Sequence, residues 1–150
     1  PIALAQKQAT RLTKTELAEI MTPLRGCVTK LREGVATEDQ HTVVRTHVML
    51  ALAIEHSRIV RGLREHLEAG QAALAAVHAR AMATGTWQPV PLCFGELDAI
   101  AEAVDLHEFQ LQQLSAGELH RITRKLMNQL RSSGGLVEHR QAAELGLKAA

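Results

Sequence analysis

Two histidines and two glutamates stand where the hydrophobic pattern predicts buried side chains. His47 and Glu55 lie in one segment with apolar residues at helical spacing, and His107 and Glu108 lie in another. A buried histidine or carboxylate is costly unless it gains a partner, so we expect these four side chains to meet one another. Such a cluster could be a structural hydrogen-bond network, a metal site, or a general acid–base pair.

The residues favour the structural network. A di-iron helical bundle needs two Glu-x-x-His motifs, and the chain has one, from Glu38 to His41. We therefore predict no metal and no cofactor. Because a carboxylate partner raises the pKa of a histidine, we expect a raised pKa for at least one of His47 and His107. Stability would then be complete below about pH 6.5 and decline as the pH rises through the folded-state pKa.

Other signs of catalysis are absent from the sequence. It contains no G-x-S-x-G, phosphate-loop, G-x-G-x-x-G or H-E-x-x-H motif. The two cysteines, Cys27 and Cys93, are too few for a disulfide framework. Cys27 flanks an apolar stripe, and Cys93 has no basic neighbour in sequence that would activate its thiol. We predict a protein that is not an enzyme.

The composition indicates an all-helical fold. The 150 residues include 23 alanines and 21 leucines, the strongest helix formers, but three aromatic residues. The net charge of +1 provides no overall attraction for nucleic acid or an acidic membrane. No stretch of about 18 apolar residues occurs, so we expect no membrane association and a cytoplasmic location.

The elements that must position these side chains follow from caps and breakers. Capping boxes begin at Thr13, Thr37 and Ser115, and Gly34 is a typical helix end. Together with the apolar stripes they predict an antiparallel bundle of about five helices. The predicted helices are 13–34, 37–57, 63–85, 96–114 and 115–132, in a single domain over 13–132. We expect residues 1–12 to be a flexible arm and 133–150 a weakly helical or disordered tail.

The helix predicted over 63–85 has two apolar faces. One follows its leucines, and the other is a stripe of alanines: Ala69, Ala72, Ala76, Ala79 and Ala83. Either this helix is central and packs on both sides within the chain, or the alanine stripe is the seam of a homodimer or other homo-oligomer. Both interpretations stay open at this point.

The loop over 85–95 carries two of the three aromatic residues, Trp87 and Phe94. They form either an apolar plug over the end of the bundle or a patch on which a protein partner docks. We expect Phe94 to be part of a plug and leave the position of Trp87 open.

A possible nucleic-acid surface is the basic face of the last helix, formed by Arg121, Arg124, Lys125 and Arg131. Such a face is more often simply solvated. Residues 100–111 resemble a helix-turn-helix, but Asp105 stands where the turn glycine belongs. An unbroken helix accounts for every apolar position there and is the favoured interpretation.

Three stretches carry a resemblance to a known group of proteins: Arg32-Glu-Gly-Val-Ala-Thr-Glu38, Ala83-Thr-Gly-Thr-Trp87 and Ala103-Val-Asp-Leu-His-Glu-Phe-Gln-Leu111. They are similar to small helical proteins of bacterial prophages and integrative elements, and the similarity covers about residues 13–132. The resemblance implies an accessory role in a mobile element and supplies no functional residues. We therefore expect a self-associating interaction or regulatory protein, with a small DNA-binding regulator and an enzyme as the alternatives.

Overall fold

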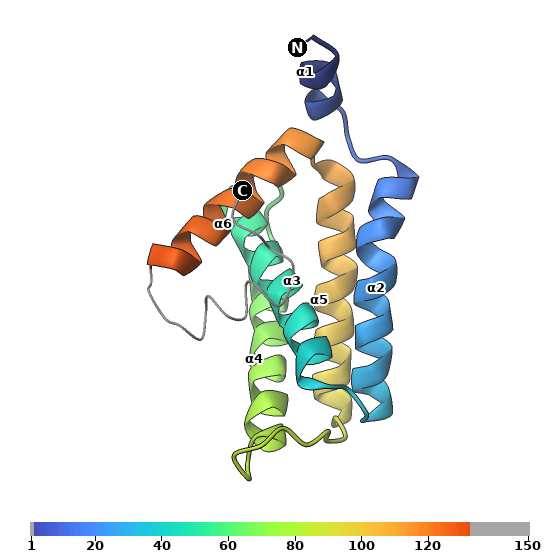
Figure 1. The fold of residues 1–150 in the computed structure, drawn as a ribbon, viewed down its shortest axis with the longest axis vertical. Coiled ribbons are helices and arrows are strands. Elements are labelled where there is room, and N and C mark those ends of the chain that lie inside the picture. Colours follow the sequence, from blue (N-terminus) through green and yellow to red (C-terminus); the bar gives the residue numbers. More distant parts are fainter. Residues whose placement is uncertain (1, 133–150) are drawn as a thin grey trace.

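Every regular element of the structure, a computed structural model that describes residues 2–132, is a helix (Figure 1). The helices are α1 (Ile2–Ala9), α2 (Lys14–Glu33), α3 (Glu38–His56), α4 (Arg64–Ala81), α5 (Phe94–Gln113) and α6 (Ala116–Ser132). The all-helical prediction is confirmed for this range. The number of helices in this range is six and not about five, because the segment predicted to be a flexible arm contains α1. The predicted tail, 133–150, lies outside the described residues.

The helix ends follow the local sequence signals. The side-chain oxygens of Thr13, Thr37 and Ser115 accept the backbone N–H three residues later, at 3.1, 3.2 and 3.1 Å. The residue at each of those third positions returns a bond to the backbone N–H of its cap. Gly34 ends α2 with φ +73°, a left-handed conformation that suits glycine. The three predicted capping boxes are confirmed.

The segment before Thr13 differs from the prediction, because residues 2–9 are helical. The segment is rich in Ala, Leu, Gln and Lys, which favour helix. α1 buries none of its own residues. It is attached to the start of α6 by the Ala116 N–H, which donates to the Thr10 carbonyl at 3.0 Å. Gly117 accommodates the nearby Gln8 backbone.

The central element is α3, which contacts α2, α4, α5 and α6. Figure 1 shows α2, α4 and α5 along the long axis of the molecule, α3 crossing them obliquely, and α6 sloping across one end. The prediction that 63–85 might be the central helix is therefore wrong. The large side chains buried between the helices include Leu24, Val44, Ile54, Leu67, Leu74, Ile100, Leu111 and Leu114.

The α4 and α5 helices pack closely at Gly70. A Cβ at this position would lie 2.5 Å from the Ala103 Cβ and 3.1 Å from the Ala99 carbonyl oxygen. α5 continues without interruption through residues 100–111, so the helix-turn-helix interpretation of that segment is wrong and the unbroken helix is confirmed. The predicted break between α3 and α4 is also present, over residues 57–63.

Candidate functional site

His47 of α3 and His107 of α5 meet in the interior, as their spacing predicts. The Gln110 amide donates to the Ala51 carbonyl at 3.0 Å, which leaves its Oε1 as an acceptor 3.3 Å from His107 Nδ1. His107 must then donate from Nδ1 and accept at Nε2, where His47 Nδ1 lies at 3.4 Å. The result is a directed chain of hydrogen bonds from His47 to Ala51, with His107 neutral.

The pKa values of both histidines shift downward, opposite to the prediction. Burial, together with the neighbouring His47, lowers the pKa of His107 to about 3, and burial lowers the pKa of His47. The prediction of a raised pKa is wrong because neither histidine has a carboxylate partner in the structure.

The two glutamates of the predicted cluster bind elsewhere. Glu55 Oε1 accepts from the backbone N–H groups of Gly62 and Leu63, at 2.9 and 3.4 Å, and so holds the connection to α4. Glu108 forms an ion pair with Arg25 of α2, and Arg25 also binds Asp105 at 2.9 Å. The four-residue cluster is therefore a histidine pair and two separate carboxylates.

The structure places both aromatic residues near the α4–α5 connection, of which Phe94 was expected to be part of a plug and Trp87 was left open. Phe94 is 86% exposed, so the prediction that it plugs the bundle is wrong. Trp87 is half-buried, and its Nε1–H donates to the Ala36 carbonyl at 3.0 Å. Its ring lies 5.3 Å from that of His41 and 5.9 Å from that of His78, between centroids. Trp87 is therefore the residue that closes this end of the molecule.

The other candidate surfaces lie on the outside. All five alanines of the predicted seam are exposed: Ala69, Ala72, Ala76 and Ala79 on α4, and Ala83 in the turn that follows it. Within residues 2–132, therefore, no other segment packs over the alanine stripe. The basic candidates of α6 are exposed as well: Arg121, Arg124, Lys125 and Arg131.

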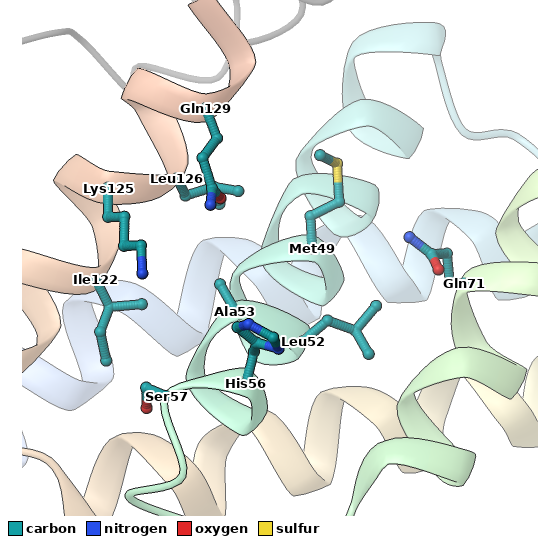
Figure 2. Close-up of a pocket in the computed structure, with 10 residues that line it drawn as sticks. All are labelled: Met49, Leu52, Ala53, His56, Ser57, Gln71, Ile122, Lys125, Leu126 and Gln129. Carbon is teal, nitrogen blue, oxygen red and sulfur yellow. The ribbon is translucent and has the colours of Figure 1, made fainter. Parts of the chain in front are cut away.

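A pocket of about 280 Å³ lies between α3, α4 and α6. Its lining comes from α3 and the residue after it (Met49, Leu52, Ala53, His56 and Ser57), from α4 (Gln71) and from α6 (Ile122, Lys125, Leu126 and Gln129). Figure 2 shows side chains of α6 extending toward α3, with Lys125 and Gln129 on one side and His56 on the other. Apolar side chains thus form the body of the pocket and polar groups surround it.

The ionisable side chains in the lining of this pocket are both basic. Its lining contains the Lys125 amine and the His56 imidazole but no aspartate or glutamate. The remaining polar groups are the amides of Gln71 and Gln129 and the Ser57 hydroxyl, which donates to the Ile54 carbonyl at 2.5 Å. The arrangement suits an apolar group that carries a negative charge or a hydrogen-bond acceptor at one end.

Sequence reasoning missed this pocket, although a signal was present. The lining residues of α3 are 49, 52, 53 and 56, and those of α6 are 122, 125, 126 and 129, so both sets repeat at i, i+3, i+4 and i+7. The α3 set is a second face, separate from the face that holds His47. His41 was missed too: it lies in register with Val44 and Val48, and its Nε2–H donates to the Leu74 carbonyl at 2.8 Å.

Within residues 2–132, no three His, Cys, Asp or Glu side chains are grouped so that they could hold a metal ion. No helix in that range combines the length and apolarity needed to span a membrane. Comparison with protein-family models, curated proteins and solved structures finds no match to this chain.

Proposed function

We propose that this is a non-enzymatic binding protein that holds an apolar group of its ligand or partner in the α3–α4–α6 pocket. The observation that carries the proposal is the pocket itself, with its volume of about 280 Å³ and its apolar body. A dry cavity of ~150 Å³ is already large enough to bind benzene. The pocket is close to the ~300 Å³ at which small-molecule sites begin.

The surroundings of the histidines support a structural role for them. His107 is 1% exposed, and both of its ring nitrogens have partners inside the core. A general base must reach a proton of its substrate, and no such approach to His107 is open. The pocket, for its part, contains no carboxylate that could act with His56 as an acid–base pair.

We propose further that the protein self-associates through α4. The support is the exposure of the whole alanine stripe, Ala69 to Ala83, because small side chains allow two helices to approach closely. An accessory role in a bacterial mobile element, which the sequence resemblance implies, belongs to the same proposal.

A second candidate function is nucleic-acid binding by the basic face of α6. It is favoured by the exposure of Arg121 and Arg124 on a helix whose other side packs on the molecule through Ile122 and Leu126. Phosphate contacts would give an affinity for mixed-sequence DNA that falls steeply with salt. Arg121→Gln would weaken such binding, whereas no binding at low salt would exclude this function.

Methionine-methyl NMR tests the binding proposal directly. The chain has four methionines, of which Met49 lines the pocket, while Met21 and Met82 lie outside it. With ¹³C-methyl methionine, 1-octanol should shift the Met49 signal in a saturable way and leave Met21 and Met82 unchanged. Ala53→Phe should abolish the shift because it fills the pocket, and the exposed α2 variant Ala18→Phe should not. A folded protein with an unmoved Met49 signal would contradict the proposal.

A further inference from the structure

The pocket has basic side chains at its edge and apolar side chains inside. Lys125 from α6 and His56 from α3 supply the only ionisable groups of its lining, and both are exposed at their ends. No ion pair of Lys125 is present within residues 2–132. The long stem of a lysine can lie along apolar surface while its amine stays at the water. The amine of Lys125 is thus positioned at the edge of an apolar pocket, and no carboxylate of residues 2–132 forms an ion pair with it.

The pocket also limits the size of its occupant. At ~30 Å³ for a group the size of a water molecule, about 280 Å³ holds roughly nine such groups. A short alkyl chain or an aryl-alkyl group has this size, whereas a two-chain lipid does not. The apolar surfaces of Met49, Leu52 and Leu126 face this volume.

We infer that the pocket binds a small single-chain amphiphile with one anionic head, whose apolar part lies among Met49, Leu52 and Leu126 and whose head lies at Lys125. This inference rests on the proposed function and adds the class of ligand. The head is a carboxylate or a phosphate monoester, since both are anions that accept hydrogen bonds from an amine. Gln129, one turn after Lys125 on α6, carries an amide group that can donate to the same head.

Four eight-carbon probes separate the apolar from the ionic contribution: octanoate, octyl phosphate, 1-octanol and octylammonium. Each is titrated into the ¹³C-methyl-methionine protein, and the Met49 shift gives its Kd. Octanoate or octyl phosphate should bind more tightly than octylammonium, and the tighter of the two anions identifies the head. Burial of a chain of this length predicts dissociation constants in the millimolar range or tighter.

Lys125→Gln tests the role of the amine. An exposed ion pair is worth roughly two- to fivefold in affinity, so this variant should weaken the anionic probe by that factor and leave 1-octanol unchanged. Arg124→Gln is the matched control, because Arg124 carries the same charge on the same helix but does not line the pocket. It should alter neither affinity.

The outcomes distinguish the two proposals. Equal binding of octylammonium and octanoate, or an unchanged octanoate affinity in Lys125→Gln, would overturn the anionic class and leave the binding function intact. A Met49 signal that no probe moves would overturn both. Raised salt should weaken the anions and not 1-octanol, and the opposite result would also count against the anionic class.

Discussion

His107 has lost its contact with water, so its stability in the core depends on the hydrogen bonds that it makes. The chain from His47 through Gln110 to Ala51 uses His107 as a donor at Nδ1 and an acceptor at Nε2. A second proton on His107 would convert that acceptor into a donor and place it against the donor of His47. Protonation of His107 would therefore break this series of hydrogen bonds and would also bury a charge.

This arrangement predicts a specific dependence of stability on pH. The folded-state pKa of His107 is about 3, below the unfolded value of about 6.5. The stabilisation is therefore complete above about pH 6.5 and is lost as the pH falls toward the folded pKa, by up to ~1.4 kcal/mol per pH unit. His107→Gln should flatten this slope when urea unfolding is followed from pH 7 to pH 4.5.

The exposed histidine of α6, His120, provides the control. His120→Gln should retain the wild-type slope, because His120 is exposed and takes no part in the hydrogen bonds between His47 and Ala51. If His107→Gln and wild type lose stability in parallel as the pH falls, the neutral, buried state of His107 is wrong.

The spacing of the apolar residues identified His47 and His107 as inward-facing, because the position of a residue along a helix fixes the direction of its Cα–Cβ bond. Their partners could not be predicted in the same way. Glutamate has a long side chain, so Glu55 reaches the turn after its own helix and Glu108 reaches Arg25 on α2. Which donor lies within reach depends on the turn or helix that packs beside the glutamate, and the projection of a single helix does not contain it.

At the level of elements, local signals were sufficient where a local contact stabilises the structure. A capping box satisfies backbone N–H groups within four residues, so Thr13, Thr37 and Ser115 were recognisable from sequence. α1 has no buried residue and no such box, and its stability depends on its contact with the start of α6. A helix that is stabilised by a contact distant in sequence is difficult to predict from its own residues.

The contact between α4 and α5 gives a prediction at this scale. Gly70→Ala should destabilise the protein by about 1–3 kcal/mol, because the new methyl group would overlap with Ala103. Gly26→Ala is the matched control: Gly26 lies inside α2 with no atom within 4 Å of the position of a Cβ, so the same change should stabilise by about 0.5–1 kcal/mol. Chemical denaturation measures both. Equal effects of the two substitutions would show that helices α4 and α5 are not closely packed at Gly70.

At the scale of the whole molecule, the pocket results from the oblique course of α3. One face of α3 packs on α2, α4 and α5, and α6 covers the remaining face only partly because it slopes across the end of the molecule (Figure 1). The apolar periodicity of α3 and of α6 was visible in the sequence, but the angle between them was not. A pocket between helices depends on that angle and so could not be predicted.

The exposed alanine stripe gives a prediction about assembly. Ala76 lies in the middle of the stripe on α4, and Ala76→Glu would place a charge in the proposed seam, where it would have no partner. Light scattering at tens of micromolar should therefore show an oligomer for wild type and a monomer for Ala76→Glu. Ala18→Glu adds the same side chain at an exposed position of α2 and should leave the oligomer intact. A wild-type protein that is already monomeric would exclude the seam, and α4 would then present its alanines to water simply because alanine favours helix.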